Sequence, residues 1–225
     1  MYEFLTGPMV WVAFGVFGIG LTVRTVLYLR GLDWKLDRVT YSRNIPFGIK
    51  GAARSVFFWL IPLGTRSWRN NPLFTFAVFA FHLALIMGPV FLEAHSILLM
   101  ERWGVGFWSL PAMVSDVLTL MVMITSLFFI LRRFGMAEVR LVTSFYDILV
   151  LGIAVAPFIT GFMAHHHAGS YKFWLYAHIL SGEVMLMAIP FTKLSHFLLF
   201  FLARIQIGMD FGIKRGGMKS KGMVW

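Results

Sequence analysis

The sequence contains no cysteine and few charged residues. Without cysteine, the chain cannot form a disulfide, a structural zinc site with Cys ligands or a Cys-ligated iron–sulfur cluster of its own. If the protein moves electrons, residues of another type must hold the carrier.

Charged side chains make up only 13% of the 225 residues, whereas apolar ones make up 59%, and the mean hydropathy is +0.77. A soluble chain has about 25% charged and about 45–50% apolar residues. This composition excludes a soluble enzyme, a disordered chain and a nucleic-acid-binding domain. We interpret the formal net charge of +10 as the charge of loops that flank a membrane. No basic segment precedes the first apolar stretch, so we expect that stretch to be retained rather than cleaved as a signal peptide.

Long apolar stretches predict an all-α integral membrane protein with five transmembrane helices in a single domain over 1–225. About 20 apolar residues are needed to cross about 30 Å of hydrocarbon. A shorter apolar segment, Val56–Leu63, lies between basic residues and is predicted to be interfacial. The predicted spans are 8–29, 72–100, 110–131, 141–164 and 173–203.

Lysine and arginine gather in three segments, which predicts the orientation of the spans. The loop 30–71, the connection between the third and fourth spans and the tail 204–225 are basic, whereas the opposite side has only Arg102 and Lys172. Basic loops remain in the cytoplasm. The N-terminus is therefore predicted to lie outside and the C-terminus in the cytoplasm.

Two histidines in the last predicted span, His178 and His196, are 18 residues apart. In one continuous helix this spacing is five whole turns, so both would share a face about 27 Å apart along the axis. Ionisable residues inside a membrane are costly and usually functional. This arrangement predicts two stacked haems with one axial ligand each from this helix, because imidazole is a common haem ligand.

The partner ligands are predicted to be His82 and His95 in the second span. Matching their depths pairs His95 with His178 and His82 with His196. However, 13 residues of ideal helix would leave His82 and His95 about 140° apart, unless Pro89 distorts the helix between them. If that helix is straight, a single haem between His82 and His178 is the alternative.

The sequence indicates a functional role less strongly for the other polar residues of the predicted spans and loops. His165, His166 and His167 are consecutive, so they cannot share one face of a helix and are expected in a solvated loop, or else beside a quinone or a partner protein. Glu183, Asp116 and Asp147 are expected to form hydrogen bonds within the bundle.

Two parts of the chain resemble the membrane cytochrome b (gamma) subunit of respiratory nitrate reductase. One is the third-to-fourth connection, with Leu131–Phe134, Val139, Arg140, Thr143 and Asp147–Leu149. The other is the last span, with His178–Gly182 and Pro190–His196. That family's last helix carries two haem-ligating histidines at the same spacing.

The second span resembles a more particular group. Asn71–Leu73, Phe81, His82, Pro89 and Glu93–His95 are similar to the cytochrome b subunits of transmembrane redox complexes of sulfate-reducing bacteria, the high-molecular-weight cytochrome c (Hmc) type and its Tmc relative. The lysine beside the quinone site of the nitrate reductase family has no counterpart in Met113–Asp116.

The resemblance implies a haem b subunit of an electron-transfer complex in the bacterial inner (cytoplasmic) membrane, rather than an enzyme by itself. The implied partners are a cytoplasmic Fe–S subunit of the heterodisulfide-reductase type, a periplasmic multihaem cytochrome c, other integral membrane subunits and menaquinone. The alternative is a haem-free or single-haem anchor that holds peripheral redox subunits and binds quinone. A transporter is disfavoured, because the sequence has no repeat and no broken-helix signature.

Overall fold

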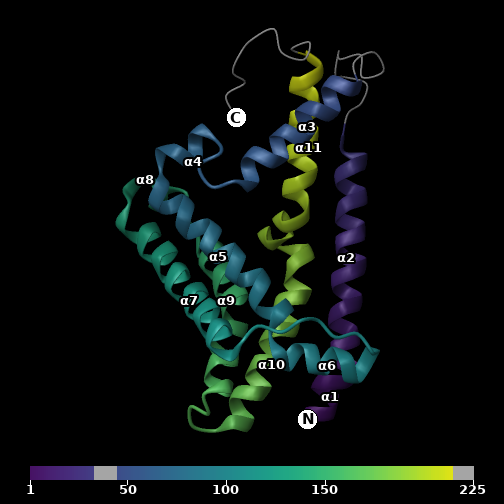
Figure 1. Ribbon diagram of the computed structural model, residues 1–225, viewed down its shortest axis with the longest axis vertical. Coiled ribbons are helices and arrows are strands. Elements are labelled where there is room, and N and C mark those ends of the chain that lie inside the picture. The colour runs from purple at the N-terminus through teal and green to yellow at the C-terminus, as the bar shows by residue number, and fades with distance from the viewer. Residues whose placement is uncertain (33–44, 215–225) are drawn as a thin grey trace. The chain divides into compact units, whose positions relative to one another are not determined.

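Helices and their connecting loops make up all the residues that the structure describes (Figure 1). The computed structural model describes residues 1–32 and 45–214, with side chains up to Phe211. Within these ranges, six helical segments are long and apolar enough to cross a membrane, which is the pattern of an all-α, multi-pass membrane protein. They are Tyr2–Arg30, Pro72–Phe91, Ala112–Gly135, Phe145–His165, Tyr171–Phe191 and Lys193–Phe211.

The outward faces of these helices are apolar. Helix α2 (Val10–Arg30) is apolar all round over its first three turns, yet it buries only Ala13. A helix of this kind needs a nonpolar environment around it. Ile19 is 70% exposed and Ile124 is 65% exposed, so large apolar side chains point away from the chain's own packing. Lipid or the apolar faces of other membrane subunits would cover them.

The chain divides into two compact units, which are described separately. Unit 1 comprises Met1–Val16 and Ala77–Ala188, and unit 2 comprises the described residues of Phe17–Phe76 and Ile189–Trp225. The single domain that the sequence predicts stays a prediction.

Unit 1 is centred on three helices, α5, α7 and α9. Its apolar core joins Phe81 and Ala84 of α5, Val122 of α7, and Val155 and Phe158 of α9. Helix α10 packs along α9. The elements of this unit are α1 (Tyr2–Phe4), a π-helical turn (Leu5–Met9), the start of α2, most of α5 (Pro72–Phe91), α6 (Glu93–Trp103), α7 (Ala112–Gly135), α8 (Ala137–Leu141), α9 (Phe145–His165) and α10 (Tyr171–Ala188).

The second predicted span is not one helix. Helix α5 ends at Phe91, Leu92 has an extended ψ of 128°, and α6 begins at Glu93. The break at Leu92 comes three positions after Pro89. His82 and His95 therefore belong to different helices, and the angular offset calculated for a continuous helix does not apply to them.

The last predicted span is also interrupted. Helix α10 ends at Ala188, two 3₁₀ turns (Ile189–Phe191 and Lys193–Ser195) follow, and α11 (His196–Lys214) begins at His196. The shared face that the sequence predicts for His178 and His196 required an unbroken helix. These two histidines lie in different units, and their common orientation stays a prediction.

Unit 2 packs α2 against the interruption between α10 and α11. The Arg24 guanidinium donates a hydrogen bond of 3.1 Å to the Pro190 carbonyl, and Tyr28 donates one of 2.6 Å to the Gln206 side chain. A Cβ on Gly20 would lie 2.7 Å from the Pro190 ring, so only glycine fits there. The one charge within the first apolar stretch thus satisfies a carbonyl that the break leaves without a helical partner.

Helix α3 (Ile45–Leu60) includes the first part of the short apolar segment Val56–Leu63, whose interfacial position stays a prediction. It buries Gly48, Gly51, Ala52 and Ser55 on one face, and α11 packs against it. Small residues let two helix backbones approach closely in membrane proteins. The remaining short helix of this unit is α4 (Arg66–Asn70). Part of the basic loop, residues 33–44, and the end of the basic tail, residues 215–225, lie outside the described residues.

Gly208→Ala should destabilise the contact between α3 and α11. A Cβ on Gly208 would lie 2.5 Å from the Gly51 carbonyl oxygen and 2.8 Å from the Ala52 Cα, which are backbone atoms that cannot rotate away. Such overpacking costs about 1–3 kcal/mol. We expect a lower midpoint of thermal unfolding in detergent.

The matched control is Gly18→Ala, since a Cβ on this helical glycine of the same unit would meet nothing within 4 Å. Its gain in helix propensity, up to about 1 kcal/mol, should leave the midpoint unchanged or raised. Equal midpoints for the two variants would contradict the close packing.

Candidate functional site

His95 is positioned by the end of α5. The last carbonyls of a helix have no partner within the helix. Pro89 lies in the last turn of α5, and its carbonyl accepts a hydrogen bond of 2.8 Å from His95 Nδ1, while the Phe91 carbonyl accepts one from the Leu110 amide. The chain turns at Leu92, and this turn brings His95 back to the carbonyl that α5 leaves open.

His178 reaches α9 from the neighbouring α10. Its Nδ1 lies 2.8 Å from the Pro157 carbonyl oxygen. In α9, the residue one turn beyond Pro157 is Gly161, and a Cβ there would lie 2.8 Å from His178 Nδ1. The absence of a side chain at Gly161 therefore gives the imidazole access to the carbonyl. Thr160 and Ser181 add a second polar contact between α9 and α10, at 3.1 Å.

These two histidines face each other within unit 1. Their ring centroids are 5.9 Å apart and their planes differ by 13°. Two imidazoles that bind one metal ion from opposite sides, with bonds of about 2 Å each, have ring centres about 6 Å apart. The separation is one at which the two imidazoles could hold a single metal ion between them.

The hydrogen bonds also define the ring tautomer. A carbonyl oxygen only accepts, so Nδ1 of His95 and of His178 must carry the proton, and the neutral ring keeps its lone pair on Nε2. Metal-ligating histidines usually donate their other ring N–H to a carbonyl or a carboxylate in this way. Both rings therefore offer the nitrogen that a metal ion needs.

His82 and His196 use the same ring nitrogen. His82 Nδ1 bonds the Val78 carbonyl one turn earlier in α5, and His196 Nδ1 bonds the Lys193 carbonyl, both at 2.8 Å. His82 lies in unit 1 and His196 in unit 2, so their pairing stays a prediction. His82 is seven residues, or about 10 Å of helix, from Pro89. Because His95 contacts the Pro89 carbonyl, His82 lies farther along the axis of α5 from the His95–His178 pair.

The residues that sequence reasoning missed are the ones that hold the histidines. The carbonyls of Pro89 and Pro157 accept the Nδ1–H bonds, and Gly161 admits the His178 ring. A signal was available for the first, because a proline followed six residues later by a histidine in an apolar stretch favours a break with a carbonyl to satisfy. The second depends on which face of α9 meets α10, which the sequence does not specify.

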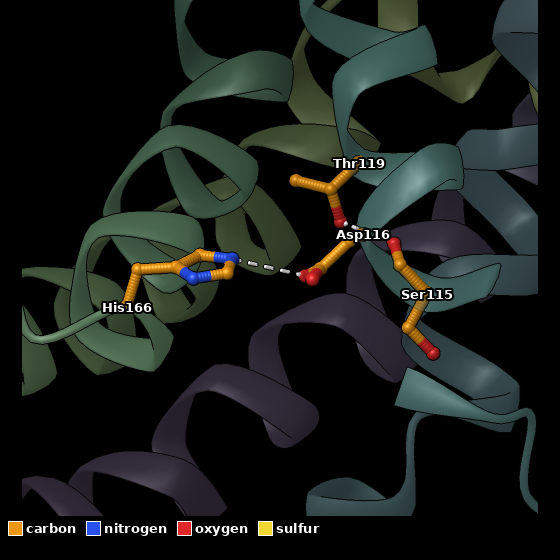
Figure 2. A network of polar contacts seen from close by, with 4 residues as sticks. All are labelled: Ser115, Asp116, Thr119 and His166. Carbon is orange, nitrogen blue, oxygen red and sulfur yellow. Dashed lines mark hydrogen bonds and ion pairs between the residues drawn. The ribbon is translucent and has the colours of Figure 1, made fainter. Parts of the chain in front are cut away.

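A second polar cluster involves two residues of the histidine triplet. His166 Nε2 lies 3.2 Å from an oxygen of Asp116, at the start of α7 (Figure 2). His165 joins them, and one ligand atom from each of the three residues lies within 4.8 Å of the others. The expectation that consecutive histidines cannot form one site applies only inside a helix, and α9 ends here.

The two other acidic residues have different environments. Asp147 accepts hydrogen bonds from the amide and the hydroxyl of Ser144 at the start of α9, so it caps that helix. Glu183 is only 4% exposed, and neither of its carboxylate oxygens has a hydrogen-bond partner among the described residues. It lies in α10, five residues after His178.

Comparison with known proteins finds a relative of nearly the same length. No protein-family model matches the chain, and no solved structure matches it. A curated protein of Nitratidesulfovibrio vulgaris strain Hildenborough is 49% identical over 217 residues, which cover 96% of this chain and 96% of the relative. The relative carries only the name "Protein", which states no activity. With this identity along nearly the whole of both chains, the chain belongs to the same family as the N. vulgaris protein.

Proposed function

We propose that the chain is the haem b membrane subunit of a multi-subunit respiratory redox complex. The observation that carries this proposal is the His95–His178 pair, whose rings are 5.9 Å apart and nearly parallel. Both donate Nδ1–H to proline carbonyls, which leaves both Nε2 atoms for iron. Bis-imidazole ligation suits electron transfer, because no coordination position remains open for a substrate.

The residues around this pair would orient the ligands and keep water away. Pro89 and Pro157 hold the rings through their carbonyls, and Gly161 leaves room for the His178 imidazole. The apolar core of α5, α7 and α9 fixes the helices that carry the two prolines. A bound haem would supply reversible one-electron transfer at its iron.

A second haem between His82 and His196 is part of the proposal. In both residues the Nδ1 atom bonds a backbone carbonyl at 2.8 Å, as in the first pair. The sequence resemblance supports this second pair through the 18-residue spacing of His178 and His196. A single-haem membrane anchor is the alternative, and it is favoured because, among the four predicted ligands, His95 and His178 are the pair that the described residues bring together in one unit.

We further propose five crossings of a bacterial inner membrane, with the N-terminus outside. A sixth crossing by α11 would carry the basic tail to the outer side, against the tendency of basic segments to stay in the cytoplasm. The interrupted segment from α10 to α11 would then count as one crossing, with α11 continuing toward the cytoplasm beside α3.

The partners come from the sequence resemblance, and charge and the absence of cysteine assign the faces on which they would dock. The basic loop 30–71 and the tail 204–225 would dock a cytoplasmic Fe–S subunit of the heterodisulfide-reductase type. The outer loops, around Glu101–Gly106 and His165–Tyr171, would meet a periplasmic multihaem cytochrome c. Other integral membrane subunits would cover exposed apolar helices such as α2, and menaquinone would exchange electrons with the complex.

Replacing His95 or His178 with alanine should remove the haem that they share. Haem per chain should fall by about half if the protein holds two haems, and almost completely if it holds one. His82→Ala and His196→Ala should each remove the second haem only. Pyridine haemochrome assay and reduced-minus-oxidised spectra of the purified subunit measure these losses.

His167→Asn is the matched control, because this histidine belongs to neither predicted pair and asparagine tolerates its positive φ of 49°. It should keep the full haem content. Unchanged haem content in both His95→Ala and His178→Ala, or wild-type protein without b-type bands, would refute the proposal.

Gly161→Ala should disturb the same haem without touching a ligand. The new methyl group would overlap His178 Nδ1 and Cε1, at 2.8 and 2.9 Å, and push the ring from the Pro157 carbonyl. We expect lower haem occupancy or a shifted reduction potential, together with a cost of about 1–3 kcal/mol in stability. Redox titration and thermal unfolding report the two effects.

Gly152→Ala, in the same helix, is the control, because a Cβ there would meet nothing within 4 Å. If both variants behave like the wild type, His178 does not depend on access through Gly161.

The absence of native cysteine makes the topology directly testable. Single-cysteine variants at Ser67, Ser170 and Ser220 should differ in reaction with a membrane-impermeant thiol reagent on intact spheroplasts. Ser170→Cys should react from outside, whereas Ser67→Cys and Ser220→Cys should react only after permeabilisation. Reaction of Ser220→Cys from outside would instead require a sixth crossing.

A further inference from the structure

The end of α9 gathers two histidines that the haem proposal does not use. Helix α9 ends at His165, and the chain leaves the helix in a Schellman turn: the Ala168 amide bonds the Met163 carbonyl and the His167 amide bonds the Ala164 carbonyl. His166 has ψ of 13° and His167 has φ of 49°. Because these backbone angles differ from those of a helix, the three side chains are not spaced as they would be in a helix. The His165 and His166 rings can therefore lie close together.

The two that converge meet an acidic side chain from another helix. His165 and His166 have ring centroids 5.0 Å apart with planes at 83°. His166 Nε2 lies 3.2 Å from Asp116 Oδ1 (Figure 2). Asp116 lies in the first turns of α7, within the same unit as α9. His167 turns elsewhere, and its ring contacts Tyr171.

The spacing of these atoms suits a transition-metal ion. Tetrahedral zinc with bonds of about 2.0–2.1 Å has neighbouring ligand atoms about 3.3 Å apart. The His166–Asp116 pair already has this separation, and all three ligand atoms lie within 4.8 Å of one another. Small side-chain rotations would close the remaining difference, since His165 and His166 are exposed.

We propose that Asp116, His165 and His166 form a binding site for a divalent transition-metal ion, and that the site prefers Zn²⁺. Two imidazoles and one carboxylate are a donor set that zinc favours, and water would take the fourth position. Mg²⁺ and Ca²⁺ prefer oxygen ligands only. The bound ion would join the end of α9 to the start of α7. The site is independent of the haem proposal, because it shares no ligand with it.

The first test is zinc binding to the full-length protein in detergent, purified through an affinity tag without histidine and freed of metal by a chelator. Wild-type protein should retain one zinc ion per chain after gel filtration, and Mg²⁺ should not displace it. Asp116→Asn, His165→Gln and His166→Gln should each weaken binding by at least about 10-fold, measured by competition with a chromophoric chelator.

His167→Asn is the control, because it changes the third histidine of the triplet and keeps a residue suited to the left-handed turn. It should bind zinc like the wild type. Failure of the wild type to retain zinc would overturn the proposal, as would equal binding by the three ligand variants, or a loss in His167→Asn as large as in them.

X-ray absorption at the zinc edge identifies the atoms that bind zinc in the wild-type protein. It therefore tests the site even if a variant fails to fold. Two imidazoles with additional oxygen ligands are expected. A shell of oxygen alone, or of a single imidazole, would refute the site. The measurement is specific to zinc, so haem iron does not affect it.

Discussion

Hydrogen bonds from polar side chains to proline carbonyls organise both units of this chain. Inside an apolar environment, a backbone carbonyl without a partner costs several kcal/mol, because no water is present to replace it. Each helix irregularity therefore needs a donor from elsewhere in the fold. Two side chains provide such donors at helix irregularities, His95 to Pro89 and Arg24 to Pro190, and His178 adds a bond to the Pro157 carbonyl within the continuous helix α9.

For the two histidines, the bond that satisfies the backbone also defines the chemistry of the ring. Donation from Nδ1 fixes the tautomer and the ring orientation, and it leaves Nε2 as the nitrogen with a lone pair. A free histidine would lose rotational freedom when it bound a metal ion. Here the fold itself holds both rings at a centroid separation of 5.9 Å, so this part of the ordering cost belongs to folding rather than to cofactor binding.

The sequence predicted the apolar helices because hydropathy depends on composition over about 20 residues. It did not predict the break at Leu92 or the 3₁₀ turns between α10 and α11, since each depends on a few residues whose backbone groups find partners far away in the chain. The pair His95 and His178 was predicted from depth along the helices. Its geometry also requires Gly161, whose role depends on the packing of α10 on α9.

The histidine triplet shows why residue spacing alone misjudges a site at a helix end. Inside a helix, adjacent residues point about 100° apart, which argues against a shared ligand. At the end of α9, the Schellman turn changes the backbone angles from one residue to the next, and Asp116 approaches from α7. The two groups of histidines then differ in their surroundings. His95 and His178 are half-buried and turn Nδ1 to backbone carbonyls, whereas His165 and His166 are exposed beside a carboxylate. That carboxylate supplies negative charge for a hydrated dication, so the two kinds of site would select different ligands within one bundle.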